Sequence, residues 1–203
     1  MLLHEILYTH GTDKVNYSVL YHALFEARRM SIGSILEIGI GTLEPEAHSS
    51  MVGWARDGYR QGASLRVWKE YFPNAAIYGW DVQPDTQFTE PGIKTFLCDS
   101  TDSIQVAECI RAMEVSEFDL VIDDGSHLPQ DQLATLENVL PYVCDGGIYV
   151  IEDIDIHSPL TQTPELIGEI CGRSPYFCVG FKRNLVVICK RNDAAPDLFV
   201  KRL

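Results

Sequence analysis

YFCVGF, Tyr176 to Phe181, and LVVICK, Leu185 to Lys190, are apolar runs separated by only three residues. The linking residues, Lys182, Arg183 and Asn184, are too few for a crossover between parallel strands, which needs about a dozen residues. Strands joined by so short a link must pair antiparallel. The sequence therefore predicts that this part of the chain forms a β-hairpin.

Upstream of the hairpin, apolar strand-like runs alternate with helical patterns. The apolar runs lack the polar alternation of a half-exposed strand, which is typical of parallel strands buried on both faces. Such alternation predicts βαβ units and a doubly wound sheet. The expected strands are Ser34–Ile40, Ala76–Val82, Ile93–Asp99, Phe118–Asp124 and Gly147–Asp153, and the expected helices cover about Ser64–Tyr71, Ser103–Met113 and Gln130–Leu140.

A mostly parallel α/β sheet that ends in an antiparallel hairpin, with helices on both faces, is the outline of the class I methyltransferases, a Rossmann-like fold. The chain has 203 residues, 46% of them hydrophobic, which suits one sizeable core. We therefore expect a single methyltransferase domain over residues 1–203, with residues 1–30 as an N-terminal helical cap or lid. The segment Leu43–Gly62, rich in Gly, Glu, Ser and His, is expected to be flexible.

Composition argues against two kinds of partner. Lys plus Arg number 16 against 29 Asp plus Glu, a formal charge of −13, so the phosphate backbone of a nucleic acid would be repelled. The apolar runs fall short of the roughly 20 residues of a membrane helix, and Met1–Leu7 lacks the basic start of a signal peptide, so no membrane insertion is expected. The six cysteines form no CxxC pair, which favours reduced thiols and a cytoplasmic protein.

The first expected strand ends in LEIGIGT, Leu36 to Thr42. Gly39 and Gly41 would let the backbone approach a ligand at the carboxyl end of this strand, where open parallel sheets bind ligands. A dinucleotide fingerprint would need a further glycine, but Glu44 stands three residues after Gly41. The pattern therefore argues against a nicotinamide-dependent oxidoreductase, which is kept as an alternative.

Acids also end the next two expected strands. Asp81 is placed to accept hydrogen bonds from ribose hydroxyls, and Asp99 lies where an adenine amino group is expected. Either acid alone is equally consistent with a helix cap or a solvated loop. Together with the glycine turn they favour a nucleoside-sized donor. We expect the donor site to include Glu37, Asp123 and Ser64 as well. Ser64 would contact the methionine end of the donor, unless it only caps the helix that it begins.

Two buried runs, FDLVIDDGSH (Phe118–His127) and IYVIEDI (Ile148–Ile154), each end in adjacent acids. Burying like charges together is costly unless a cation or protons compensate. We expect Asp124, Glu152 and Asp153 to converge as oxygen ligands. Such a set suits Mg²⁺, with Mn²⁺ or Ca²⁺ as substitutes, and the absence of nearby cysteine argues against zinc. A capping role for these acids is the alternative.

Five segments form a combined pattern: GTDK (Gly11–Lys14), LEIGIG (Leu36–Gly41), GASLRVWKEYFPNAAIYGWD (Gly62–Asp81), IDDGSH (Ile122–His127) and GGIYVIEDI (Gly146–Ile154). Together they resemble the metal-dependent, S-adenosylmethionine-dependent sugar O-methyltransferases of the macrocin and mycinamicin type. A weaker resemblance is to the methyltransferase domain of a chlorovirus multidomain glycosyltransferase.

The resemblance implies methyl transfer from S-adenosylmethionine to a hydroxyl of a rhamnose-like deoxysugar on a glycan or glycoside, with Mg²⁺ or Mn²⁺ as the metal. His127 would be the general base, three residues after Asp124, where catechol-type methyltransferases carry a lysine. Thr12, Asp13 and Lys14 would belong to a lid or contact the donor carboxylate, unless they form a solvated turn.

A non-catalytic partner domain is the second alternative, but such a module has no evident need for three convergent carboxylates. The sequence does not identify the acceptor, the hydroxyl or the oligomeric state. A homo-oligomer and a place in a longer multidomain chain both stay open.

Overall fold

The computed structural model of the protein describes residues 2–47, 49–55, 59–113, 115–154, 176–182 and 184–190, with backbone alone over 176–182. The chain divides into two compact units, Met1–Leu97 and Cys98–Leu203.

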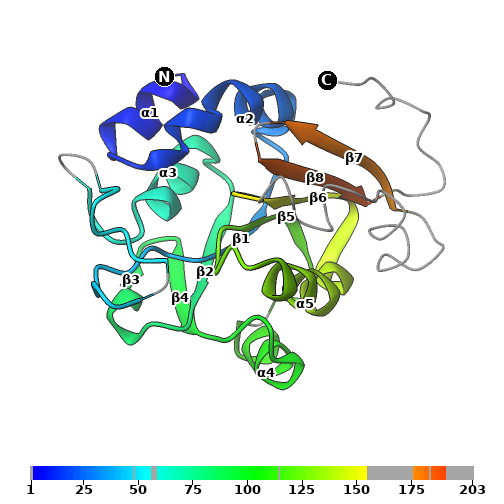
Figure 1. Ribbon diagram of the computed structural model, residues 1–203. Coiled ribbons are helices and arrows are strands. Elements are labelled where there is room, and N and C mark those ends of the chain that lie inside the picture. Colours follow the sequence, from blue (N-terminus) through cyan, green and yellow to red (C-terminus); the bar gives the residue numbers. More distant parts are fainter. Residues whose placement is uncertain are drawn as a thin grey trace. The chain divides into compact units, whose positions relative to one another are not determined.

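The sheet of the first unit has the strand order β3-β4-β2-β1 (Figure 1). β1 (Ser34–Ile38), β2 (Ala76–Asp81) and β4 (Ile93–Leu97) are parallel, as expected from their continuous apolar runs. The two-residue strand β3 (Thr89–Glu90) pairs antiparallel with β4 at the edge. β3 was not predicted, because two residues are too few to show a period.

Helices α1 (Leu3–Thr9), α2 (Ser18–Phe25) and α3 (Ala63–Tyr71) pack side by side in the first unit (Figure 1). Short 3-10 turns cover Asp13–Tyr17, Glu26–Arg28 and Pro84–Thr86.

Aromatic side chains join α2 to α3. Tyr21 and Phe25 stack at 5.2 Å between ring centroids, and the Trp68 ring meets the edge of Tyr21 at 5.5 Å. Such edge-to-face contacts stabilise a core beyond their buried area. Trp68 and Trp80 are fully buried, whereas Trp54 is 74% exposed.

The sheet of the second unit has the order β5-β6-β8-β7. β5 (Phe118–Asp123) and β6 (Val143–Ile151) are parallel, while β8 (Leu185–Lys190) is antiparallel to β6 and to β7 (Tyr176–Lys182). The predicted hairpin is therefore confirmed. β6 begins four residues earlier than expected, at a point where the β5–β6 register shifts.

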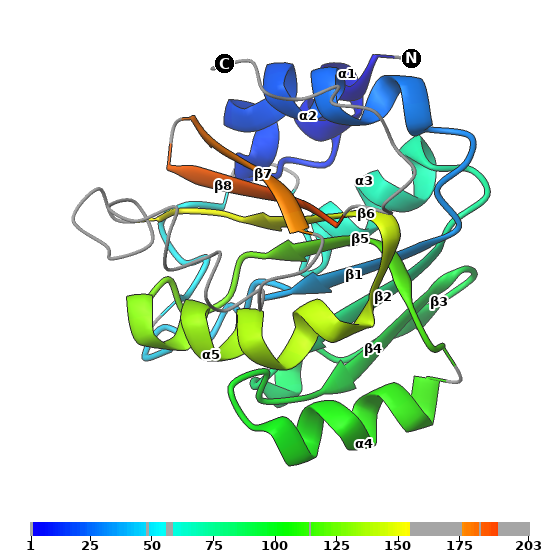
Figure 2. The same ribbon diagram turned by 90° about the vertical axis from the view of Figure 1, so that its right-hand side faces the viewer.

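The helices of the second unit are α4 (Ser103–Met113) and α5 (Pro129–Val139), followed by a 3-10 turn over Leu140–Tyr142. The two helices run beside each other (Figure 2). Both lie where the helical patterns predict them.

Several expectations concern the N-terminal half. Residues 1–30 contain α1 and α2, while their role as a lid, like the single domain, stays a prediction. Of Leu43–Gly62 the structure describes 43–47, 49–55 and 59–62, and its flexibility also stays a prediction. No helix in the described part of the chain is long and apolar enough to span a membrane. Cys98, Cys109, Cys144 and Cys189 are not part of disulfide bonds, whereas the side chains of Cys171 and Cys178 lie outside the described residues.

Candidate active site

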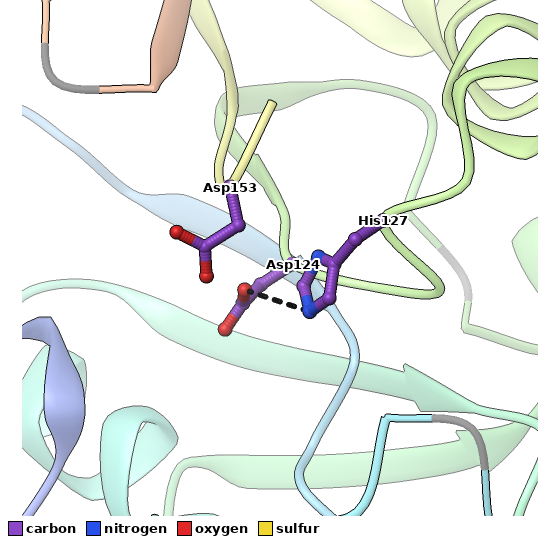
Figure 3. A group of neighbouring side chains, drawn as sticks. All are labelled: Asp124, His127 and Asp153. Atoms are coloured by element: carbon purple, nitrogen blue, oxygen red, sulfur yellow. Dashed lines mark ion pairs between the residues drawn. The ribbon is translucent and has the colours of Figure 1, made fainter. Parts of the chain in front are cut away.

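The strand ends of the second unit gather two carboxylates and an imidazole. Asp124 directly follows β5, and Asp153 follows β6 by two residues. Parallel pairing sets Asp123 opposite Ile151, so the turns after these strands are neighbours. Atoms of Asp124, His127 and Asp153 that can bind a metal all lie within 4.8 Å of one another (Figure 3). We call these three residues the acid–histidine group.

Two members of the acid–histidine group have a strained backbone. His127 and Asp153 adopt positive φ angles of 61° and 50°, in the left-handed region. This region is costly for a residue with a Cβ, about 1–2 kcal/mol each. Strain of this kind persists only where surrounding structure imposes it, and it concentrates at functional sites. The backbone geometry therefore supports a functional role for the group.

The two ring nitrogens of His127 have different surroundings. Nε2 lies 4.0 Å from Oδ1 of Asp124 (Figure 3), whereas Nδ1 is buried without a hydrogen-bond partner. A buried polar atom in this state is costly and calls for a partner. Nε2 is thus the nitrogen turned toward the carboxylates.

The chemistry of the acid–histidine group fits a hard divalent cation. Two half-buried carboxylates offer oxygen ligands, and a cation would compensate their mutual repulsion. The residues present therefore fit the predicted Mg²⁺, although metal binding itself stays a prediction.

Two acids beside this group are buried instead. Glu152 is 1% exposed and lies outside the acid–histidine group, and its role as a third metal ligand stays a prediction. Asp123 is 3% exposed and accepts hydrogen bonds from the Tyr149 hydroxyl and the Gly125 N–H. Burial raises the pKa of Asp123 to about 7, and the neighbouring charge of Asp124 adds to the effect. Its assignment to the donor site is likewise untested by this geometry.

In the first unit, Glu37 lies at the centre of a buried network. Ser64 Oγ and Trp68 Nε1 donate to its carboxylate, and Lys14 Nζ lies 3.8 Å from Oε1. Glu37 is wholly buried and Lys14 is 2% exposed, so the two charges compensate each other away from water. Thr12, whose hydroxyl accepts from the Lys14 N–H, is also buried. Thr12 and Lys14 are therefore buried and held by these contacts, and they do not form a solvated turn.

The glycine turn after β1 is braced by Asp81. Its carboxylate accepts from the backbone N–H of Ile40 and of Gln83, each at 2.8 Å. Burial raises the pKa of Asp81, and these backbone bonds act in the opposite direction. Gly41 has φ 91°, and a Cβ there would collide with the Tyr59 hydroxyl. Gly39 and Gly41 both have a left-handed backbone, which favours glycine in this turn, while their approach to a ligand stays a prediction.

Asp99, in the second unit, caps the turn that leads into α4. Its Oδ1 accepts from the Thr101 N–H at 2.9 Å and from the Thr101 hydroxyl at 2.6 Å. This geometry favours the capping alternative, and a contact with adenine stays a prediction.

A hollow of about 510 Å³ lies beyond β2 in the first unit. Asp85, one of its lining residues, accepts from the hydroxyl of Thr42 and from the amide of Gln61, and so ties the glycine turn to the segment after β2. The lining residues are Glu44, Glu46, Ala47, Gln83, Pro84 and Asp85.

No protein-family model matches the chain. The 8-demethyl-8-alpha-L-rhamnosyl tetracenomycin-C 2'-O-methyltransferase of Streptomyces olivaceus is 30% identical over 148 residues, which are 71% of this chain and 35% of that protein. The demethylmacrocin O-methyltransferase of Streptomyces fradiae is 36% identical over 135 residues, 66% of this chain and 30% of the relative. The chain is a homologue of sugar O-methyltransferases. It spans about a third of the length of these relatives.

The fold of this methyltransferase homologue matches that of a solved methyltransferase. MycE methyltransferase from the mycinamycin biosynthetic pathway, in complex with Mg, SAH and mycinamycin VI, has a TM-score of 0.77 and 25% identity, covering 98% of this chain and 57% of MycE. The class I methyltransferase fold, mostly parallel with a C-terminal antiparallel hairpin, is thereby confirmed. The resemblance to the macrocin and mycinamicin type is confirmed as well, while the chlorovirus resemblance stays a prediction.

Sequence reasoning missed one contact and one residue of the methyltransferase homologue. The pairing of Lys14 with Glu37 joins residues 23 positions apart, which no periodicity reveals. Gln132, a buried amide beside Glu152, looks in the sequence like any polar helix residue. The only available signal was position, since Gln132 lies in the first turn of the helix that follows IDDGSH.

Proposed function

We propose that the chain is the catalytic domain of an S-adenosylmethionine- and Mg²⁺-dependent O-methyltransferase that acts on a rhamnose-like deoxysugar of a glycan or glycoside. The acid–histidine group carries the proposal, and its residues lie within two of the five segments that resemble this family, Ile122–His127 and Gly146–Ile154. The tetracenomycin relative acts on a rhamnosyl group by its name, and the MycE structure holds Mg, SAH and mycinamycin VI.

Asp124 and Asp153 would hold the cation, with Glu152 as the further carboxylate expected from the sequence. Mn²⁺ would substitute for Mg²⁺, because both accept carboxylate oxygens. When bound, such a cation lowers the pKa of a coordinated hydroxyl and fixes its position.

His127 would act as the general base through Nε2, the nitrogen that faces Asp124. The acceptor hydroxyl oxygen forms a bond to the methyl carbon, and the bond between that carbon and the donor sulfur breaks. The hydroxyl proton passes to Nε2, which leaves a methyl ether and S-adenosylhomocysteine. Removal of this proton during attack is worth roughly 100- to 10,000-fold in rate.

The remaining assigned residues would serve the donor. In the first unit, the carboxylate of Asp81 would add ribose hydroxyls to the two backbone donors it already binds. Gly39 and Gly41 would keep the turn close to the donor, while Glu37 and Ser64 would support it from the buried network. In the second unit, Asp99 and Asp123 are the residues assigned to the same ligand.

The direct test is methylation of small rhamnosides by the purified chain with S-adenosylmethionine and Mg²⁺. We expect a singly methylated product by mass spectrometry and a defined position by NMR. Calorimetry with NADH separates the oxidoreductase alternative, since a methyltransferase should bind S-adenosylhomocysteine and not NADH. If the chain binds neither S-adenosylmethionine nor S-adenosylhomocysteine, the enzymatic proposal fails and the result favours a non-catalytic partner domain.

The proposal includes a cytoplasmic setting, supported by the four described cysteines that are not in disulfides, and a sugar acceptor instead of nucleic acid, supported by the formal charge of −13. Light scattering would decide the oligomeric state.

A further inference from the structure

Two buried side-chain atoms in the described part of the chain lack a hydrogen-bond partner, Nδ1 of His127 and Oε1 of Gln132. Gln132 is 3% exposed and lies in the first turn of α5, five residues after His127. An unpaired buried polar atom costs about 1–3 kcal/mol. The two atoms are complementary, because an amide oxygen can only accept whereas a protonated Nδ1 donates.

The other end of the Gln132 amide is already fixed. Its Nε2 donates to the backbone oxygen of Glu152 at 3.0 Å. The Glu152 N–H donates to the backbone oxygen of Asp123 at 2.8 Å, and the Ile154 N–H donates to the backbone oxygen of Asn184 at 2.9 Å. The backbone is thus held on both sides of Asp153, whose positive φ needs such support. Gln132 therefore helps to hold a candidate metal ligand in place.

The Gln132 amide and the His127 ring border the same turn. The amide reaches the oxygen of Glu152, while the ring contributes an atom within 4.8 Å of a carboxylate oxygen of the next residue, Asp153. Histidines at metal sites commonly donate their second ring N–H to an oxygen acceptor, which fixes the tautomer and the ring orientation. In His127, a hydrogen on Nδ1 would leave Nε2 free toward Asp124.

We propose that Gln132 is a positioning residue of the active site. Its Nε2 holds the Glu152–Asp153 turn, and its Oε1 accepts a hydrogen bond from Nδ1–H of His127 in the metal-bound protein, directly or through one buried water. One amide thereby sets both a metal ligand and the tautomer of the base. This inference rests on the proposed function, because the cation is part of it.

The first test measures Mn²⁺ binding to the purified chain by electron paramagnetic resonance. Gln132→Leu keeps the size of the side chain but removes both hydrogen bonds, and loss of such supporting contacts typically weakens metal affinity about 10- to 100-fold. Gln130→Leu is the matched control, since Gln130 is exposed on the same helix, and it should bind like the wild type.

Equal Mn²⁺ affinity of the wild type and Gln132→Leu would overturn the positioning role while leaving the proposed function intact. A wild type that binds no Mn²⁺ would defeat the metal-dependent function and the positioning role together. The two failures are therefore distinguishable.

The second test reads the tautomer of His127 in the Mg²⁺-loaded wild type by nitrogen-15 NMR, with the signal assigned by its loss in His127→Ala. We expect hydrogen on Nδ1. Gln132→Glu should keep this tautomer, because a carboxylate still accepts, whereas Gln132→Leu should not. Hydrogen on Nε2 in the wild type would overturn the proposal even if Gln132→Leu fails to fold.

Discussion

Asp123 and Asp124 are adjacent, but their carboxylate charges are compensated in different ways. Asp123 is buried in the protein, where burial raises its pKa to about 7, so a proton compensates its charge only in part at neutral pH. Asp124 is half-buried and faces His127 and Asp153, where a cation can compensate. A strand alternates its side chains between two faces, and the end of β5 thus supplies one buried acid and one candidate metal ligand.

Replacement of His127 tests its role as base. In His127→Ala we expect kcat to fall roughly 100- to 10,000-fold, because the hydroxyl proton loses its acceptor. The KM for the acceptor and the affinity for the donor should change little. The measurement is steady-state kinetics with a rhamnoside as the varied acceptor, followed by formation of the methylated product. A raised KM with near-normal kcat would instead mean that His127 positions the acceptor.

Replacement of Asp81 tests the donor site. Asp81→Ala should weaken binding of S-adenosylhomocysteine about 10- to 100-fold, because charge-assisted hydrogen bonds are worth about 1.5–3 kcal/mol and the Ile40 N–H loses its partner as well. Calorimetry measures the change, with Asp145→Ala as an exposed control. Unchanged affinity in Asp81→Ala would remove Asp81 from the site.

At the scale of elements, Arg66 ties α3 to β3. Its Nε and Nη2 donate to the two carboxylate oxygens of Glu90 at 3.0 and 2.8 Å, and Arg60 adds a third bond at 2.8 Å. Hydrogen bonding from Arg66 lowers the pKa of Glu90. Paired and partly exposed, such a bridge contributes roughly 0.5–1 kcal/mol.

The pH dependence of this bridge follows from the lowered pKa of Glu90. The folded state binds the Glu90 proton less tightly than the unfolded state, so the contribution is present above the ordinary glutamate pKa of about 4.3. It is lost as the pH falls through the lower pKa of the folded state. Glu90→Gln should therefore reduce the melting temperature by about 1–4 °C at pH 7, and the difference should shrink below about pH 4.

Differential scanning calorimetry of the wild type and Glu90→Gln across this range measures the effect. Glu108→Gln, exposed on α4, is the control. A difference in melting temperature that stays constant with pH would show that the Glu90 charge does not stabilise the fold.

Helices and strands with a clear hydrophobic pattern were predictable from the sequence. Those whose boundaries depend on contacts with other elements were not. The boundaries of α4 and the C-terminal hairpin follow from apolar runs and a short link. β3 was missed, and α1 was expected only as an undivided part of the helical segment 1–30, because a two-residue strand and a seven-residue helix carry little local signal. The early start of β6 depends on a register shift against β5, which no single strand encodes.

The candidate site likewise has features that the sequence predicts and features that it does not. Parallel pairing brings the carboxyl ends of strands together, so the proximity of Asp124 and Asp153 could be expected from two apolar runs. The left-handed backbone of His127 and Asp153, and the orientation of the Gln132 amide, depend on contacts between distant segments. Periodicity contains no information on such contacts.

At the scale of the whole molecule, removal of divalent metal should separate activity from donor binding. A chelator should abolish methyl transfer and added Mg²⁺ should restore it, because the acid–histidine group would lose its cation. Affinity for S-adenosylhomocysteine, measured by calorimetry, should survive, since the expected nucleoside contacts involve other residues. Full activity after exhaustive metal removal would contradict a metal-dependent reaction.

The burial of Trp68 has an optical consequence. The chain has three tryptophans, Trp54, Trp68 and Trp80, and all belong to the first unit. Iodide should quench the exposed Trp54 and spare the other two, whose emission then reports on that unit alone. Denaturant curves from this emission and from circular dichroism should coincide if residues 1–203 unfold cooperatively as one domain. Separate midpoints would mean that the two halves of the chain lose their structure independently.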